Sequence, residues 1–195
     1  MNLKWTFFSA ALSVLVFLTA CSRSTYQACR TKNDDLVTLD PGQSKAFLVN
    51  YEKKCNASGI KLEPTKIYRF SDFSVVSPLI DGSIDSDRRT GQPLGLKGWN
   101  TFQLSWFTWP GLIVGGWFRP LPSADWYELI GKVGDGAFFS LADQYMKEYS
   151  PKQEGELLAL ANDFPWFGRY ENNQGRVRLT AECVRLRTDG GSGGK

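Results

Sequence analysis

The chain has 195 residues, of which 42% are hydrophobic and 14% aromatic, and its formal net charge is +3. These values predict a globular protein with one domain, and the charge is too small to indicate a nucleic-acid partner. The chain contains no histidine, which excludes Ser-His-Asp and Cys-His catalytic systems and most catalytic zinc sites. It also lacks the Walker A and G-x-G-x-x-G phosphate-binding loops. We therefore expect a binding protein and not an enzyme, with a carboxylate-pair hydrolase as the alternative.

The first 21 residues carry an export pattern. Lys4 precedes an apolar run over 5–18, and the sequence Leu-Thr-Ala-Cys ends at Cys21. The run is shorter than the ~20 apolar residues that cross a bilayer, so it is not a membrane span. The pattern resembles a bacterial lipoprotein signal that ends in a lipobox. The resemblance implies that residues 1–20 are a cleaved signal peptide and that Cys21 is acylated; an ordinary secretory signal with a chance cysteine is the alternative.

Acylation of Cys21 implies an exported protein that lipid holds on the bacterial cell envelope. More than one acyl chain gives stable anchoring, because each buried CH₂ contributes roughly 0.8 kcal/mol. Ser22 stands where aspartate is associated with inner-membrane retention, so we expect the outer membrane. Residues 21–35 are mostly polar and mixed in charge, which predicts a tether between the lipid and the domain.

Three further cysteines, Cys29, Cys55 and Cys183, follow the lipidated one. In an oxidising compartment an odd number allows one disulfide at most within the chain. Two apolar segments flank a Pro-Gly turn at 41–42 and predict a β-hairpin. A register in which position 39 faces position 45 places Cys29 opposite Cys55. We therefore predict the disulfide Cys29–Cys55, with Cys55–Cys183 as the alternative.

Short apolar segments separated by turn signals continue along the chain. Their spacing favours an all-β sandwich over a helical fold, in a domain that spans 36–188. The Gly- and Ser-rich residues 189–195 predict a flexible tail. The predicted strands are 46–51, 66–76, 126–133, 137–142, 156–162 and 176–186.

Two of these segments have a clear pattern. Residues 157–161 are apolar at every position, which predicts a central strand that is buried on both faces, with a helix over 155–163 as the alternative. Residues 176–186 alternate, so Cys183 should point inward with the apolar residues at 177, 179 and 181. The alternation changes phase after Cys183, which predicts a bulge. The arginines of this segment, at 176, 178, 185 and 187, predict a solvated strand face.

An aromatic segment extends from Trp99 to Phe118 and contains no charged residue from 100 to 118. Core burial is one interpretation. Because Pro and Gly residues break the segment, exposure of some rings is the other, and exposed rings would suit a protein partner, a membrane surface or a sugar. The aromatic residues are Trp99, Phe102, Trp106, Phe107, Trp109, Trp117 and Phe118.

The loop between the last two predicted strands, 162–175, is rich in oxygen donors. Calcium takes carboxylate, amide and backbone oxygens. Asp163 ends one strand, and Asn172 and Asn173 open the next, so the three could converge on one ion. The alternative is that they only shape a turn through side-chain to backbone bonds.

The motifs Asn-Asp-x-Pro at 162–165 and Tyr-x-Asn-Asn-x-Gly at 170–175 resemble the calcium-dependent galactophilic bacterial lectins and their galactose-binding-domain-like relatives. The resemblance implies a jelly-roll-like β-sandwich in which Asp163, Asn172 and Asn173 bind Ca²⁺, and the ion in turn coordinates sugar hydroxyls. Asp163, Asn172 and Trp166 are then the expected carbohydrate-binding residues. Two departures stand out: four residues separate Pro165 from Tyr170 where the lectins have two, and the lectins' sugar-binding histidine is absent.

We therefore expect a membrane-anchored lipoprotein with a lectin-like domain that recognises carbohydrate with the help of calcium. The alternative is an envelope protein that docks a protein partner through its aromatic segment. Exposed aromatic side chains beside Asp163 would favour the sugar, and exposed aromatic side chains at the opposite end would favour the partner.

Replacement of Cys21 tests the anchoring prediction. Cys21→Ser removes the thiol that would be acylated, so the variant should take up no fatty acid and should keep its first 20 residues. Metabolic labelling with a radioactive fatty acid measures the first effect. Equal labelling of variant and parent would contradict the lipobox interpretation.

Overall fold

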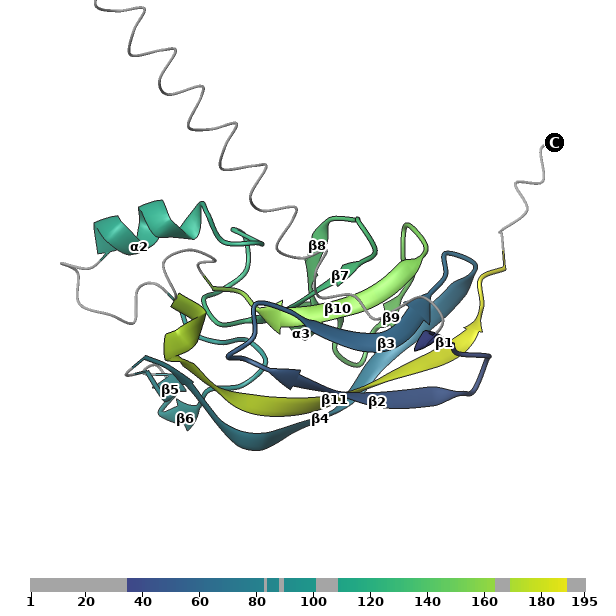
Figure 1. The fold of residues 1–195 in the computed structure, drawn as a ribbon, viewed down its shortest axis with the longest axis horizontal. Helices are drawn as coiled ribbons and strands as arrows, with labels where there is room; N and C mark the ends of the chain where they lie inside the picture. Colours follow the sequence, from purple (N-terminus) through teal and green to yellow (C-terminus); the bar gives the residue numbers. More distant parts are fainter. Residues whose placement is uncertain (1–34, 83, 88–89, 101–108, 164–168, 189–195) are drawn as a thin grey trace, which may run out of the picture.

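Two β-sheets lie face to face in the computed structural model, which describes residues 35–82, 84–87, 90–100, 109–163 and 169–188 (Figure 1). The first sheet has the strand order β1-β3-β10-β7-β8. β1 runs parallel to β3, and the other neighbours are antiparallel. The strands are β1 (Val37–Thr38), β3 (Asn56–Leu62), β10 (Gly155–Ala161), β7 (Leu129–Val133) and β8 (Phe138–Ser140).

The second sheet is antiparallel and has the order β2-β11-β4-β9. Two short strands, β5 (Ser86–Asp87) and β6 (Gln92–Pro93), form a separate ribbon. This architecture confirms the predicted all-β sandwich, and its galactose-binding-domain-like type stays a prediction. The strands of the second sheet are β2 (Ser44–Asn50), β11 (Asn173–Leu186), β4 (Lys66–Asp81) and β9 (Glu148–Tyr149).

The helices in the described part of the chain are short: α2 (Trp109–Gly116), α3 (Leu141–Gln144) and the 3-10 turn η4 (Arg169–Asn172). Pro110 is tolerated near the start of α2, because the first amides of a helix have no partner within it. Ser140 caps α3 by accepting a hydrogen bond from the Asp143 amide. None of these helices is long and apolar enough to cross a membrane.

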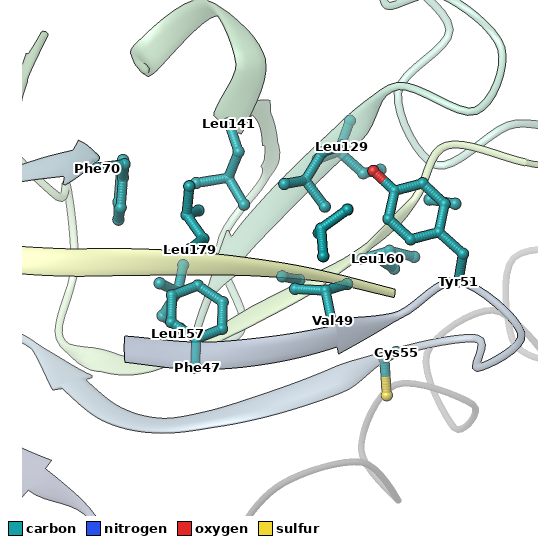
Figure 2. Close-up of a cluster of buried hydrophobic side chains, with 14 of the residues drawn as sticks. Phe47, Val49, Tyr51, Cys55, Phe70, Leu129, Leu141, Leu157, Leu160 and Leu179 are labelled. Atoms are coloured by element: carbon teal, nitrogen blue, oxygen red, sulfur yellow. The ribbon is translucent and has the colours of Figure 1, made fainter. Parts of the chain in front are cut away.

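The core lies between the two sheets, and Figure 2 shows part of it. Phe47 and Val49 of β2 lie in the same buried cluster as Leu157 and Leu160 of β10. Burying each such side chain contributes about 1.5–3 kcal/mol to folding. The apolar contact between the sheets therefore holds the sandwich together.

The strand β10 confirms the prediction of a central strand. It lies between β3 and β7 in the first sheet, and all five residues from 157 to 161 are buried. Leu157, Ala159, Leu160 and Ala161 belong to the core cluster between the sheets, and Leu158 is also buried. The helix alternative for this segment is wrong.

The strand β11 confirms the predicted alternation. Val177, Leu179, Ala181 and Cys183 are buried, whereas Arg176 and Arg178 are exposed. The pairing of β11 with β4 shifts register between Cys183 and Arg185, where the phase change predicts a bulge.

The predicted hairpin is wrong. The turn is present, since the Gln43 amide donates to the Asp40 carbonyl at 2.8 Å. However, Val37 on one side pairs with Ile60 in the first sheet, whereas β2 on the other side pairs with β11 in the second. The physical reason is that the turn itself bonds to β11: the Gly42 amide donates to the Cys183 carbonyl at 2.7 Å. The turn therefore carries the chain from one sheet to the other.

The cysteines follow only part of the prediction. Cys55 is disulfide-bonded, and Cys183 is a buried free thiol, so the alternative bridge Cys55–Cys183 is wrong. Cys29 lies outside the described residues, as does Cys21. The pair Cys29–Cys55 stays a prediction, but the hairpin register no longer supports it.

A backbone bridge between Trp99 and Trp126 closes one end of the sandwich. The Trp99 amide donates to the Trp126 carbonyl at 2.8 Å, and the Trp126 amide donates to the Trp99 carbonyl at 2.9 Å. The two indole rings stack with their centroids 5.7 Å apart. Gly98 precedes the bridge with φ +62, and a Cβ atom there would overlap the Trp126 carbonyl oxygen.

Two alanine substitutions separate this steric conflict from backbone strain. Gly98→Ala should destabilise the full chain by more than about 3 kcal/mol in urea unfolding, because the overlap adds to the left-handed strain. Gly91 has a similar φ of +67 but no atom within 4 Å of an added Cβ, so Gly91→Ala should cost only the strain, about 1–2 kcal/mol. Equal losses in the two variants would contradict the predicted overlap.

Candidate functional site

The side chain of Tyr127 joins the ends of two strands. Tyr127 is fully buried, and its backbone φ angle is +62. The phenol oxygen lies 2.8 Å from the Ile80 carbonyl of β4 and 2.6 Å from the Gln174 carbonyl of β11, and it accepts a hydrogen bond from the Gln174 amide at 3.2 Å. The β4–β11 pairing shifts register just beyond Gln174. The hydroxyl therefore satisfies backbone groups where the ladder is interrupted.

Burial and nearby carboxylates keep this phenol neutral. Burial raises the pKa of Tyr127 most, and Asp81 and Asp163 raise it further because a phenolate would be repelled by both. The ring of Tyr51 lies against Tyr127 with a centroid distance of 4.7 Å. Burial raises the pKa of Tyr51 as well. Since both carboxylates act on the Tyr127 phenol, Asp81 and Asp163 lie at the same end of the sandwich.

Asp81 organises this end. One carboxylate oxygen accepts a hydrogen bond from the Trp99 indole at 2.7 Å, and the other accepts one from the Asn172 side-chain amide at 3.3 Å. The Gly82 amide also donates to the Asn172 carbonyl at 3.1 Å. Asp81 is buried although it is charged. These donors offset the loss of water around the carboxylate.

Asn172 and Asn173 have different environments. Asn172 is exposed, at the end of η4. Asn173 is 0% exposed, and neither its side-chain oxygen nor its side-chain nitrogen has a hydrogen-bond partner among the described residues. Asn173 stands directly opposite Asp81 in the β4–β11 ladder, so the two side chains share a face of the sheet. A buried side-chain amide without partners is costly, so Asn173 is a candidate oxygen donor.

Asp163 and its neighbour Asn162 have separate roles. The Asn162 side chain accepts a hydrogen bond from the Leu121 amide at 3.0 Å and donates to the carbonyls of Leu121 and Asp125 at 2.9 Å each. These bonds hold the segment before β7 in place. Asp163 is buried, and its charge acts on Tyr127 and on Arg119. Asn162 therefore supplies side-chain to backbone bonds at this loop.

Arg119 connects the site to helix α2. Its guanidinium donates to the Gly116 carbonyl at the helix end and to the Pro122 carbonyl, and it lies 4.5 Å above the Trp126 ring. Burial lowers the pKa of Arg119, while Asp125 and Asp163 oppose that shift. Arg119 therefore lies close enough to Asp163 to offset part of its negative charge.

The aromatic segment divides into core and surface. Trp99 is buried, whereas Trp117, just after α2, is 70% exposed, and Phe118 is exposed too. Ile113 and Val114 of α2 are also exposed. Figure 1 shows α2 at the same end of the sandwich as η4. The exposed aromatic side chains thus lie at the end that holds Asp163, Asn172 and Asn173.

Several predicted residues cannot be placed. Trp166 lies outside the described residues, as do Phe102, Trp106 and Phe107, and the side chain of Trp109 is not described. Among the described residues, no group of three or more His, Cys, Asp or Glu residues is arranged to hold a metal. An ion at this end would therefore depend on amide oxygens beside two carboxylates.

Comparisons with known proteins do not assign this chain to a family. The chain matches no family model, and no curated protein and no solved structure is significantly similar to it. The resemblance to the galactophilic lectins therefore stays a prediction that rests on the motif around Asp163 and Asn172.

Tyr127→Phe tests the role of the phenol oxygen. The variant leaves the backbone groups of Ile80 and Gln174 without their hydroxyl partner, so urea unfolding should show a loss of about 1–3 kcal/mol. Tyr149→Phe is the matched control, because the Tyr149 hydroxyl makes no hydrogen bond with the described residues while its ring stacks on Phe139. Similar stability of the two variants would contradict a bridging role for Tyr127.

Proposed function

We propose that this chain is a lipid-anchored protein of the bacterial cell envelope that recognises carbohydrate with the help of calcium at the Asp163 end of the sandwich. The observation that carries the proposal is Trp117, which is 70% exposed and directly follows α2. The helix α2 lies at the same end of the sandwich as η4, which ends at Asn172 (Figure 1). An aromatic surface beside a polar site is the arrangement that distinguishes sugar binding from docking at a remote face.

Calcium suits the donors at this end. Calcium takes 6–8 oxygens from carboxylates, amides and backbone carbonyls. Asp163 supplies a full charge, and the buried Asn173 amide supplies an oxygen that has no partner among the described residues. Asp81 adds a second carboxylate, which already holds Asn172. Because Arg119 offsets part of this charge, the affinity should be low, on the order of 10⁻⁴ to 10⁻³ M.

The sugar would lie between the ion and the aromatic surface. Calcium coordinates vicinal hydroxyls, and the exposed Asn172 stands beside the ion as a hydrogen-bonding group. Trp117 and Phe118 offer flat apolar faces for the C–H side of a sugar ring. Trp166, which the sequence also predicts to bind carbohydrate, lies outside the described residues.

The location of the protein is part of the proposal. The pattern that ends at Cys21 supports an acylated N-terminal cysteine, a tether and attachment to the outer membrane. A domain held there samples the polysaccharides and glycolipids of the envelope.

Docking of an envelope protein is the second candidate function. The exposed apolar side chains around α2, namely Ile113, Val114, Trp117 and Phe118, favour it because they form an uncharged group on the surface. Aromatic anchors inside an apolar patch are typical of protein interfaces. In this case α2 binds the partner and the polar site beside it is structural.

Thermal unfolding with calcium tests the ion. At ten times the dissociation constant, calcium should stabilise the parent chain in detergent by about 1.4 kcal/mol and raise its melting temperature. Asp163→Asn removes one charge at nearly constant shape, so its melting temperature should respond much less. Magnesium is the control ion, since it requires a near-ideal octahedron that amide-rich sites seldom offer. An unresponsive, well-folded parent would remove calcium from the proposal.

A glycan array, read with calcium and with EDTA, then tests the sugar. Trp117→Ala should lose glycan binding and keep the calcium-induced shift, whereas Asp163→Asn should lose both. Leu186→Ala is the matched control, because it truncates an exposed apolar side chain on β11. Capture of a defined envelope protein that depends on Trp117 but not on calcium, without glycan binding, would favour the second candidate.

A further inference from the structure

The outer face of the second sheet carries two exposed arginines that the proposed calcium site does not use. Arg176 and Arg178 lie two residues apart on β11 and are exposed, whereas Val177 and Leu179 on the opposite face of the strand are buried in the core. Their Cα atoms are therefore about 6.6–6.8 Å apart along the strand. Neither guanidinium has a hydrogen bond or an ion pair with any described residue. The sheet thus presents two unneutralised charges side by side.

The strand register places polar residues and one exposed leucine beside these arginines. Arg176 stands between Asn50 of β2 and Ser77 of β4. Arg178 stands between Leu48 and Ser74. Directly opposite residues share a face of the sheet, so each guanidinium has a serine hydroxyl as its neighbour.

The next two sets of paired residues across β2, β11 and β4 mark the edge of this surface. Thr180 stands between Ala46 and Ser71, and it adds a further hydroxyl. Glu182 follows, and its carboxylate lies 4.0 Å from Arg69, so its charge is already offset. The positive charge is therefore confined to the rows of Arg176 and Arg178, and the hydroxyl groups extend along one side of it.

The chemistry of the surface selects its ligand. Guanidinium groups bind carboxylates through two parallel hydrogen bonds, and serine and threonine hydroxyls hydrogen-bond other hydroxyls. A membrane surface usually requires four to eight basic residues, more than the two present. The four rows contain no aromatic side chain on which a nucleic-acid base could stack. A flat, hydroxyl-rich polymer that carries carboxylates at intervals fits best.

We propose that this outer face, defined by Arg176, Arg178, Ser74 and Ser77, binds an acidic polysaccharide. The carboxylates of the polymer pair with the two guanidinium groups, and its hydroxyls bond to the serines. The surface lies on the sheet face and does not include Asp163, Asn172 or Asn173, so this binding requires no calcium. It gives the protein a second contact with envelope material, independent of the proposed lectin-like end.

Fluorescence anisotropy with labelled polygalacturonate tests this inference on the full chain in neutral detergent, with EDTA present throughout. The parent should bind, and the double variant Arg176→Gln/Arg178→Gln should bind at least about tenfold more weakly, because both charge-assisted contacts are lost. Arg185→Gln/Arg187→Gln is the matched control. It removes the same charge from the end of β11 and the residue just after it, but Arg185 pairs with Glu148 at 2.9 Å and Arg187 bonds to Ser150 at 3.2 Å. Its affinity should stay near that of the parent.

Three results would overturn the inference: no binding of polygalacturonate by the folded parent, equal weakening in both double variants, or equally strong binding of polyglutamate. The second would indicate net charge alone, and the third would indicate an acidic protein segment. Dextran, which has hydroxyls without carboxylates, should not bind. Asp163→Asn should bind polygalacturonate as the parent does, which separates this inference from the fate of the calcium proposal.

Discussion

The hydrogen bonds of the Tyr127 hydroxyl hold the candidate site together. The phenol oxygen contacts the backbone of β4 at Ile80 and of β11 at Gln174, one residue from Asp81 and one from Asn173. The ends of these two strands therefore stay together where their own ladder is interrupted. The carboxylate of Asp81 then reaches both Trp99 and Asn172. Without the phenol, the strand ends would have to satisfy buried backbone groups in another way, and the polar cluster would lose its frame.

Much of the sandwich could be predicted because its central strands carry strong local patterns. The uninterrupted apolar run of β10 reflects burial of both of its faces, and the alternation of β11 reflects burial of one face. β3 was missed because Asn56, Ser58 and Gly59 interrupt its apolar pattern, although Asn56 bonds to the backbone of β10 at Ala159. The hairpin prediction failed because a turn defines two neighbouring segments and does not define the sheet that each joins. The hydrogen bond from the Gly42 amide to the Cys183 carbonyl places the segment after the turn in the second sheet.

The candidate site was predictable only in part. Asn172 and Asn173 stand out through their amides, but the acceptor that the structure brings to Asn172 is Asp81, 91 residues away along the chain. Asp81 next to Gly82 reads as a turn signal, and no local pattern marks Tyr127. Such residues become functional candidates only when β4, β7 and β11 meet. In α2, Pro110 reads as a breaker, yet at a helix start it is favourable.

The place of β11 has a consequence for how the protein reaches its folded state. β11 is the central strand between β2 and β4, and its residue Arg176 pairs with Asn50, more than a hundred positions earlier in the chain. The second sheet thus cannot close until almost all of the described sequence has been made. Such non-local pairing slows folding. If the chain is exported as proposed, slow closure would prolong the interval in which the unfolded polypeptide can still be threaded through a membrane.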